Sequence, residues 1–140
     1  MATWSDVLDL ALDLPETVER DGRECRVRGK LFVWKRGLTE RDRVAMAGQG
    51  TPPPDGPTIA VRVPDLGVKE ALLADDPDVF FTIPHFDGYP GILIRLDRIT
   101  DADLGELIVE AWLVQAPKRL GKAYLAQPAR RAHPPRSASG

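Results

Sequence analysis

The stretch that most constrains the fold runs from Asp78 to Leu96. It holds two apolar segments, near residues 79–84 and 91–96, on either side of Asp87-Gly88. Short runs rich in β-branched and aromatic residues, bounded by proline and glycine, are typical of β-strands. Asp-Gly is a common hairpin turn pair, because glycine adopts a positive φ without strain. The pattern therefore predicts an antiparallel strand pair in this half of the chain.

Apolar residues at helical spacing predict three helices. The first is capped by Thr3 and ends before Pro15, the second spans 66–75 and buries Val68, Leu72 and Ala71, and the third is capped by Thr100 and ends at Pro117. Alternating and β-branched residues predict a strand pair within 24–36 that turns at Gly29-Lys30, and a strand at 58–63. The resulting order, α-β-β-β-α-β-β-α, predicts an α+β fold with an antiparallel sheet and helices on one face.

Two segments fall outside this pattern. Residues 48–57 are rich in glycine and proline and predict an exposed loop insertion, and residues 38–47 before them can hold one helical turn. Residues 126–140 are rich in Ala, Pro, Arg and Ser and predict a disordered tail. The expected organisation is thus a single domain at 1–125 followed by a basic tail at 126–140.

The charge of the chain is distributed unevenly. The net charge is −2, but residues 118–140 carry six cations and no acid, so residues 1–117 sum to −8. An acidic body with a basic end points weakly to an anionic partner for that end, and solvation of the tail is the simpler alternative. No apolar run is long enough for a membrane span, and residues 1–6 do not resemble a signal peptide. We therefore expect a cytoplasmic protein with no membrane partner.

The single cysteine, Cys25, excludes an intramolecular disulfide. Arg23, Arg26 and Arg28 surround it in sequence, and cations of this kind lower a thiol pKa and make the sulfur reactive. No histidine and no second cysteine lie nearby. The favoured interpretation is a small, inert strand residue.

Several separated motifs, in the same order along the chain, resemble the MmcQ/YjbR-like family. They are residues 10–17, 29–32, 70–90, 95–96, Trp112 and 116–120. The resemblance covers about residues 3–120 and omits the loop at 48–57 and the tail. It implies a two-layer α/β sandwich, α-β(3)-α-β(2)-α, similar to secretion chaperones. Family members are commonly labelled DNA-binding, through a double-wing arrangement of hairpins, and the resemblance supplies no catalytic residues.

The first hairpin gives the best case for nucleic acid. Alternating Arg26, Arg28 and Lys30 would project from one sheet face or edge, where cations can contact successive phosphates. Phe32 or Trp34 could stack on a base. The interspersed acids and the acidic body argue for a solvated face instead. If the third helix ends beside this hairpin, the cations that follow the helix could extend the patch. The candidate DNA-contacting residues are Arg23, Arg26, Arg28, Lys30, Lys118, Arg119 and Lys122.

His85, Asp87 and Tyr89 form a second group of candidate ligand-contacting residues. The alternative to DNA binding is a module that holds a protein segment or small ligand on the sheet face or in a pocket near Phe81. A metal site needs a third ligand, and turn geometry alone favours these residue types. The acids around Pro77 similarly suit a solvated turn. We expect no metal and no cofactor at either place.

Sequence motifs for catalysis are missing from the chain. It contains no Gly-x-Ser-x-Gly, no phosphate-binding glycine loop, no Cys–His pair and no HExxH. The sequence therefore predicts a non-enzymatic protein, and the alternative is an enzyme that uses scattered residues. We expect a monomer or weak dimer, with DNA as the first candidate partner.

Overall fold

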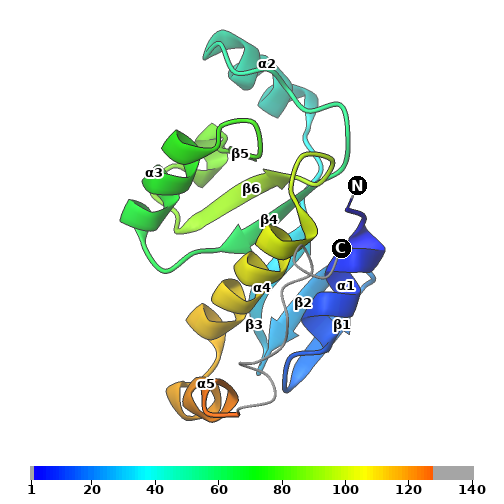
Figure 1. Cartoon of the computed structure of the whole chain (residues 1–140). Coiled ribbons are helices and arrows are strands. Elements are labelled where there is room, and N and C mark those ends of the chain that lie inside the picture. The colour runs from blue at the N-terminus through cyan, green and yellow to red at the C-terminus, as the bar shows by residue number, and fades with distance from the viewer. Residues whose placement is uncertain (1, 128–140) are drawn as a thin grey trace.

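Six antiparallel strands form one sheet in the computed structural model, which describes residues 2–127 (Figure 1). The spatial order is β1-β2-β3-β4-β6-β5. The strands are β1 Thr17–Arg20, β2 Glu24–Val27, β3 Lys30–Lys35, β4 Thr58–Arg62, β5 Phe80–Phe81 and β6 Gly91–Arg95. The helices are α1 Trp4–Leu12, α2 Glu40–Gly48, α3 Leu66–Asp75, α4 Asp101–Gln115, α5 Lys118–Leu125 and the 3-10 helix η1 Pro84–Phe86. The predicted α+β class and antiparallel sheet are confirmed.

Side-chain caps fix where the longer helices begin. Thr3 and Thr39 each form a capping box with the aspartate three residues on, Asp6 and Asp42. The Thr100 hydroxyl accepts a hydrogen bond of 3.1 Å from the backbone N–H of Asp103 at the start of α4. These bonds satisfy N–H groups that have no partner within the helix.

The main core lies between one face of the sheet and helices α1 and α4 (Figure 1). Trp112 of α4 is fully buried there, and its indole N–H donates to the carbonyl of Pro15 at 3.1 Å. Ile59 and Val61 of β4 point into this core from the centre of the sheet. The core therefore joins the first turn of the chain to the last long helix.

The opposite face of the sheet carries a second, smaller apolar cluster. Met46 of α2 packs there with Ala60, Leu93 and Phe81 from three strands and with Ile83 and Phe86 from the β5–β6 connection. Successive strand residues point to opposite faces, so Ala60 faces this cluster while Ile59 and Val61 face the main core. The middle of the sheet is thus buried on both sides.

Several elements differ from the sequence predictions. Strand β1 and helix α5 were not predicted, α2 is a helix of nine residues and not one turn, and β5 is only two residues long. The bounds of α3 agree with the prediction, but its buried residue is Lys69, whereas Val68 and Ala71 are exposed and Leu72 is half-buried. Leu72 and Leu73 of α3 pack against the edge of the main core, whereas Val68 is left at the surface.

The glycine- and proline-rich segment at 48–57 is held against the sheet. Pro54 is buried, and its carbonyl accepts a bond of 3.2 Å from Arg43. Arg95 of β6 donates to the carbonyl of Pro52 at 2.8 Å, and its guanidinium lies 4.6 Å from the centroid of the Phe81 ring. The loop thus covers the end of the second cluster. Of the predicted tail, residues 128–140 lie outside the described residues, and within 2–127 no helix has the length and apolar character needed to cross a bilayer.

A buried lysine holds the connection between β5 and β6. The Lys69 amine, on a side chain that is 6% exposed, donates to the carbonyls of Phe86 at 2.6 Å and Tyr89 at 2.9 Å. Burial lowers the pKa of this amine from its ordinary value, and the nearby Asp87 carboxylate raises it. The two bonds replace the water that the amine loses, and they fix η1 over the second cluster.

We expect Lys69→Met to lower the free energy of unfolding by about 1 to 3 kcal/mol, because two charge-assisted bonds are lost while the apolar stem is kept. Urea denaturation of the two proteins measures the difference. The control is Lys122→Met, at an exposed position on α5, which should change stability by less than about 0.5 kcal/mol. Equal stability of the Lys69 variant and the parent would contradict the role of the two bonds.

Cys25 faces the main core and is fully buried. Burial raises the pKa of its thiol to about 12, with a smaller contribution from Glu19. The arginines that neighbour it in sequence do not lower the pKa, since Arg26 points to the opposite sheet face. The interpretation of an inert strand cysteine fits this environment.

We expect the Cys25 thiol to be unreactive toward a thiol-exchange reagent at mildly alkaline pH in the folded protein and fully reactive in guanidinium chloride, because the reagent needs an exposed thiolate. Absorbance of the released product measures the reaction. Fast reaction of the folded protein would show that the strand opens readily or that the thiol is ionised.

Candidate nucleic-acid interface

Helix α5 is anchored to the end of α4 by its apolar side. Leu120 and Tyr124 pack against the main core, with the Tyr124 and Trp112 ring centroids 5.1 Å apart. Gly121 is buried, and a Cβ there would lie 3.3 Å from a Leu113 methyl. The other side of the helix carries Lys118, Arg119 and Lys122, all exposed. Docking of α5 therefore presents three cations to solvent from a fixed position.

The first hairpin turns at Arg28-Gly29, one residue earlier than predicted. Both residues have positive φ, 52° and 82°, as a two-residue type I′ turn requires. Cross-strand pairing joins Val27 to Lys30 and Arg26 to Leu31. Arg26 and Lys30 therefore point to opposite faces, so the prediction that the three cations share one sheet face is wrong.

The structure instead joins the turn to α5. Arg28 and Arg119 line one surface hollow of about 440 Å³, together with Glu16 and apolar groups of Pro117, Leu120 and Ala123. Of the three C-terminal cations expected near the hairpin, Arg119 lies beside the turn. We call the β2–β3 turn region together with α5 the basic end. Arg28 and Arg119 line its hollow, and its other cations are Arg26, Lys30, Lys118 and Lys122.

Two arginines of the basic end already form ion pairs with carboxylates of the chain. Glu24 accepts from Arg26 at 2.9 Å, and Arg26 also donates to the carbonyl of Gly29 at 3.0 Å. Glu16 accepts two bonds from Arg28, one of them 3.3 Å long from Nη2. The hydrogen bond from Arg28 lowers the pKa of the Glu16 carboxyl, and Glu16 raises the pKa of Arg28. A phosphate that binds Arg28 must therefore compete with Glu16.

Arg23 is separated from the basic end. It lies in the β1–β2 turn, at the other end of β2, where its backbone carbonyl accepts from Lys35 N–H at 2.8 Å. Four strand residues at about 3.3 Å each put some 13 Å between the two turns. Arg23 thus contributes at most a distant contact.

The aromatic residues of this hairpin are not available to stack on bases at the basic end. Phe32 is fully buried in the main core, contrary to the prediction. Trp34 is half-buried against the second cluster, with its ring centroid 6.3 Å from that of Phe86. Contacts from the basic end to a nucleic acid would therefore go to phosphates.

His85, Asp87 and Tyr89 lie in and after η1 and do not converge. His85 and Asp87 are exposed, whereas Tyr89 packs edge-on against Phe86 at 5.5 Å, under the Arg62 guanidinium at 5.2 Å. Phe81 is buried within the same cluster. Within residues 2–127 no three His, Cys, Asp or Glu side chains group as metal ligands.

Sequence reasoning missed Glu16 as part of the candidate interface. It has a positive φ of 54° and faces Arg28 across the hollow. The turn after Pro15 offered no signal for this, because the pairing depends on β1, a strand that was not predicted. The apolar residues Leu120 and Tyr124, four apart, were the available signal for α5.

Comparison with known proteins identifies the family. The YjbR family model matches residues 12–114. Uncharacterized proteins of Mycobacterium tuberculosis (strain ATCC 25618 / H37Rv) and Mycobacterium bovis (strain ATCC BAA-935 / AF2122/97) are each 53% identical over 126 residues, which cover 90% of this chain and 98% of the relative. No solved structure gives a significant match. The family model spans well over half of the chain, and the chain therefore belongs to the YjbR family.

Proposed function

We propose that the protein binds DNA through phosphate contacts at the basic end. The observation that carries the proposal is the hollow shared by Arg28 and Arg119, because it brings cations from the β2–β3 turn and from α5 to one surface. Arginine forks and lysine ammonium groups are the usual phosphate-binding groups of proteins.

The local charge supports this assignment although the chain is acidic overall. Six cations against Glu16 and Glu24 leave the basic end at +4, while residues 1–127, with 16 cations and 21 acids, are at −5. An anionic polymer would therefore be attracted to this end and repelled by the rest of the body, which fixes the orientation of approach. The proposed binding is sequence-insensitive, because the rings of Phe32 and Trp34 do not reach this surface and phosphates carry no base information.

We expect Arg119→Glu/Lys122→Glu to weaken binding to a labelled generic duplex by about tenfold or more at low salt and to reduce the slope of log affinity against log salt by about two, since each lost phosphate contact removes about one released counterion. Fluorescence anisotropy over a salt series measures both. The matched control is Arg41→Glu/Arg98→Glu, at exposed positions away from the basic end, which makes the same change in net charge.

Equal losses in both double variants would reduce the effect to net charge and contradict a localised site. A full-length variant with Arg130, Arg131 and Arg136 replaced by alanine distinguishes binding by the tail from binding by the basic end. If that variant loses all affinity while Arg119→Glu/Lys122→Glu keeps it, the binding belongs to the tail and the proposal fails.

We expect Glu16→Gln to strengthen duplex binding by about two- to fivefold, because it releases Arg28 from an exposed ion pair worth at most about 1 kcal/mol and removes a charge that repels phosphate. Glu19→Gln, at an exposed position three residues further along and outside the lining of the hollow, is the control for the charge alone. Weaker binding by the Glu16 variant would mean that the ion pair positions Arg28 for phosphate and does not compete with it.

A further inference from the structure

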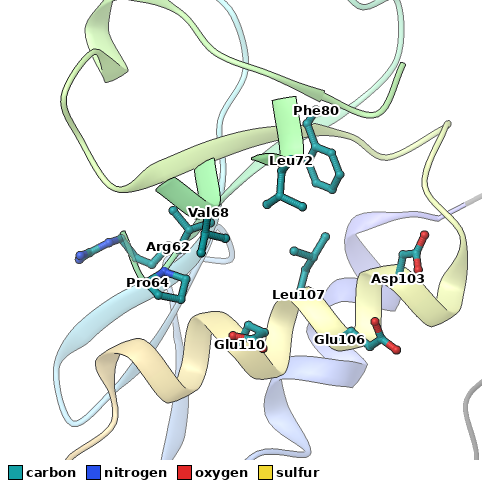
Figure 2. A pocket seen from close by; sticks show the side chains of 10 residues that line it. Arg62, Pro64, Val68, Leu72, Phe80, Asp103, Glu106, Leu107 and Glu110 are labelled. Carbon is teal, nitrogen blue, oxygen red and sulfur yellow. The ribbon is translucent and has the colours of Figure 1, made fainter. Parts of the chain in front are cut away.

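A second hollow, of about 390 Å³, lies between α3 and α4 on the helical side of the molecule (Figure 2). Its floor is apolar. Val68 and Leu72 come from α3, Phe80 from β5 and Leu107 from α4, and Figure 2 shows Leu72, Phe80 and Leu107 pointing toward one another across the gap. We call this hollow the helical groove.

Carboxylates form one wall of the helical groove. Asp103, Glu106 and Glu110 follow each other along the exposed side of α4, at spacings of three and four residues that place them on one helix face. Within residues 2–127 none of the three forms an ion pair with a cation. Arg62 lines the far side, but its side chain points away (Figure 2), donating to the carbonyl of Pro90 at 3.0 Å.

The apolar stripe of α3 is only partly covered beside this wall. Its sequence has the spacing of a helix that buries Val68 and Leu72, yet Val68 is 37% exposed and Leu72 is only half-buried. The residue of α3 that the fold does bury is Lys69, on another side of the helix. A partly exposed apolar hollow with one wall of carboxylates is typical of a protein-binding surface.

We propose that the helical groove binds a short segment of a partner protein in which apolar side chains are flanked by arginine or lysine. The apolar anchors would fill the space between Leu72, Phe80 and Leu107, and the flanking cations would pair with Asp103, Glu106 and Glu110. Charge complementarity selects this occupant, because the carboxylates repel nucleic acid and acidic segments. The groove is separate from the basic end, so a partner protein and DNA can bind together.

The test uses the full chain and a fluorescein-labelled synthetic peptide with leucines at helical spacing between arginines. The same peptide with glutamate in place of arginine is its control. We expect saturable binding of the arginine peptide only. Glu106→Gln/Glu110→Gln should weaken it about three- to tenfold, since exposed charge pairs each contribute modestly. The matched charge control, Asp9→Asn/Glu19→Gln, should leave binding unchanged.

The apolar floor is tested separately by Val68→Lys, which should weaken binding of the arginine peptide about three- to tenfold. Its control is Val44→Lys, on the exposed side of α2. Duplex binding should be the same in all the groove variants, which distinguishes this surface from the basic end. Failure of the arginine peptide to bind, or equal binding of the glutamate peptide, would overturn the proposal.

Two other occupants would also overturn it. If sedimentation velocity shows self-association that Glu106→Gln/Glu110→Gln abolishes, the groove is taken by a second copy of the chain. If replacing Arg130, Arg131 and Arg136 by alanine raises peptide affinity, the groove is taken by the chain's own C-terminal residues.

Discussion

The burial of β4 and β6 on both faces is the constraint on which the rest of the structure depends. Ile59 and Ile94 pair across the two strands and point into the main core, while the neighbouring pair Ala60 and Leu93 points into the second cluster. A shift of one residue would exchange the two sets, so the register is fixed from both sides. Beyond β3 the sheet continues into β2 and β1 with only one face covered. The β2–β3 hairpin is therefore held in place by the core on one face. Its other face is left available for contact with a partner.

The fold separates charge between its layers. Helices α1 and α4 carry acids and no cation, whereas α5 carries cations and no acid, and α5 docks beside the hairpin turn. The net charge of the whole chain conceals this division, since it sums an acidic helical layer with a basic end. A surface built in this way can attract partners of opposite charge to different sides, and each proposed site uses the charge that its own layer supplies.

Local signals in the sequence account for the parts of the fold that local chemistry determines. The threonine caps of α1 and α4 and both bounds of α3 could be predicted, because capping and helical spacing involve residues within one or two turns. β1 could not, since its four residues are mostly exposed and depend on pairing with β2. Nor could the burial of Lys69, whose carbonyl partners lie 17 and 20 residues along the chain. The candidate interface was partly predictable. Its cations are evident in the sequence, but whether Arg28 and Arg119 lie side by side depends on where α5 packs.

The backbone of the β2–β3 turn adds an argument about why arginine occupies position 28. A type I′ turn favours asparagine, aspartate or glycine at that position, and a left-handed conformation costs other residues of order 1 kcal/mol or more. Arg28 adopts a φ of 52°, and Glu16, its exposed partner, a φ of 54°. An exposed ion pair stabilises the fold by at most about 1 kcal/mol. This is less than the combined cost of two residues in the left-handed conformation. Stability alone would favour a different residue in this turn. The strain therefore points to a role for the Arg28 guanidinium outside the folded chain, at the same hollow that Arg119 lines from α5.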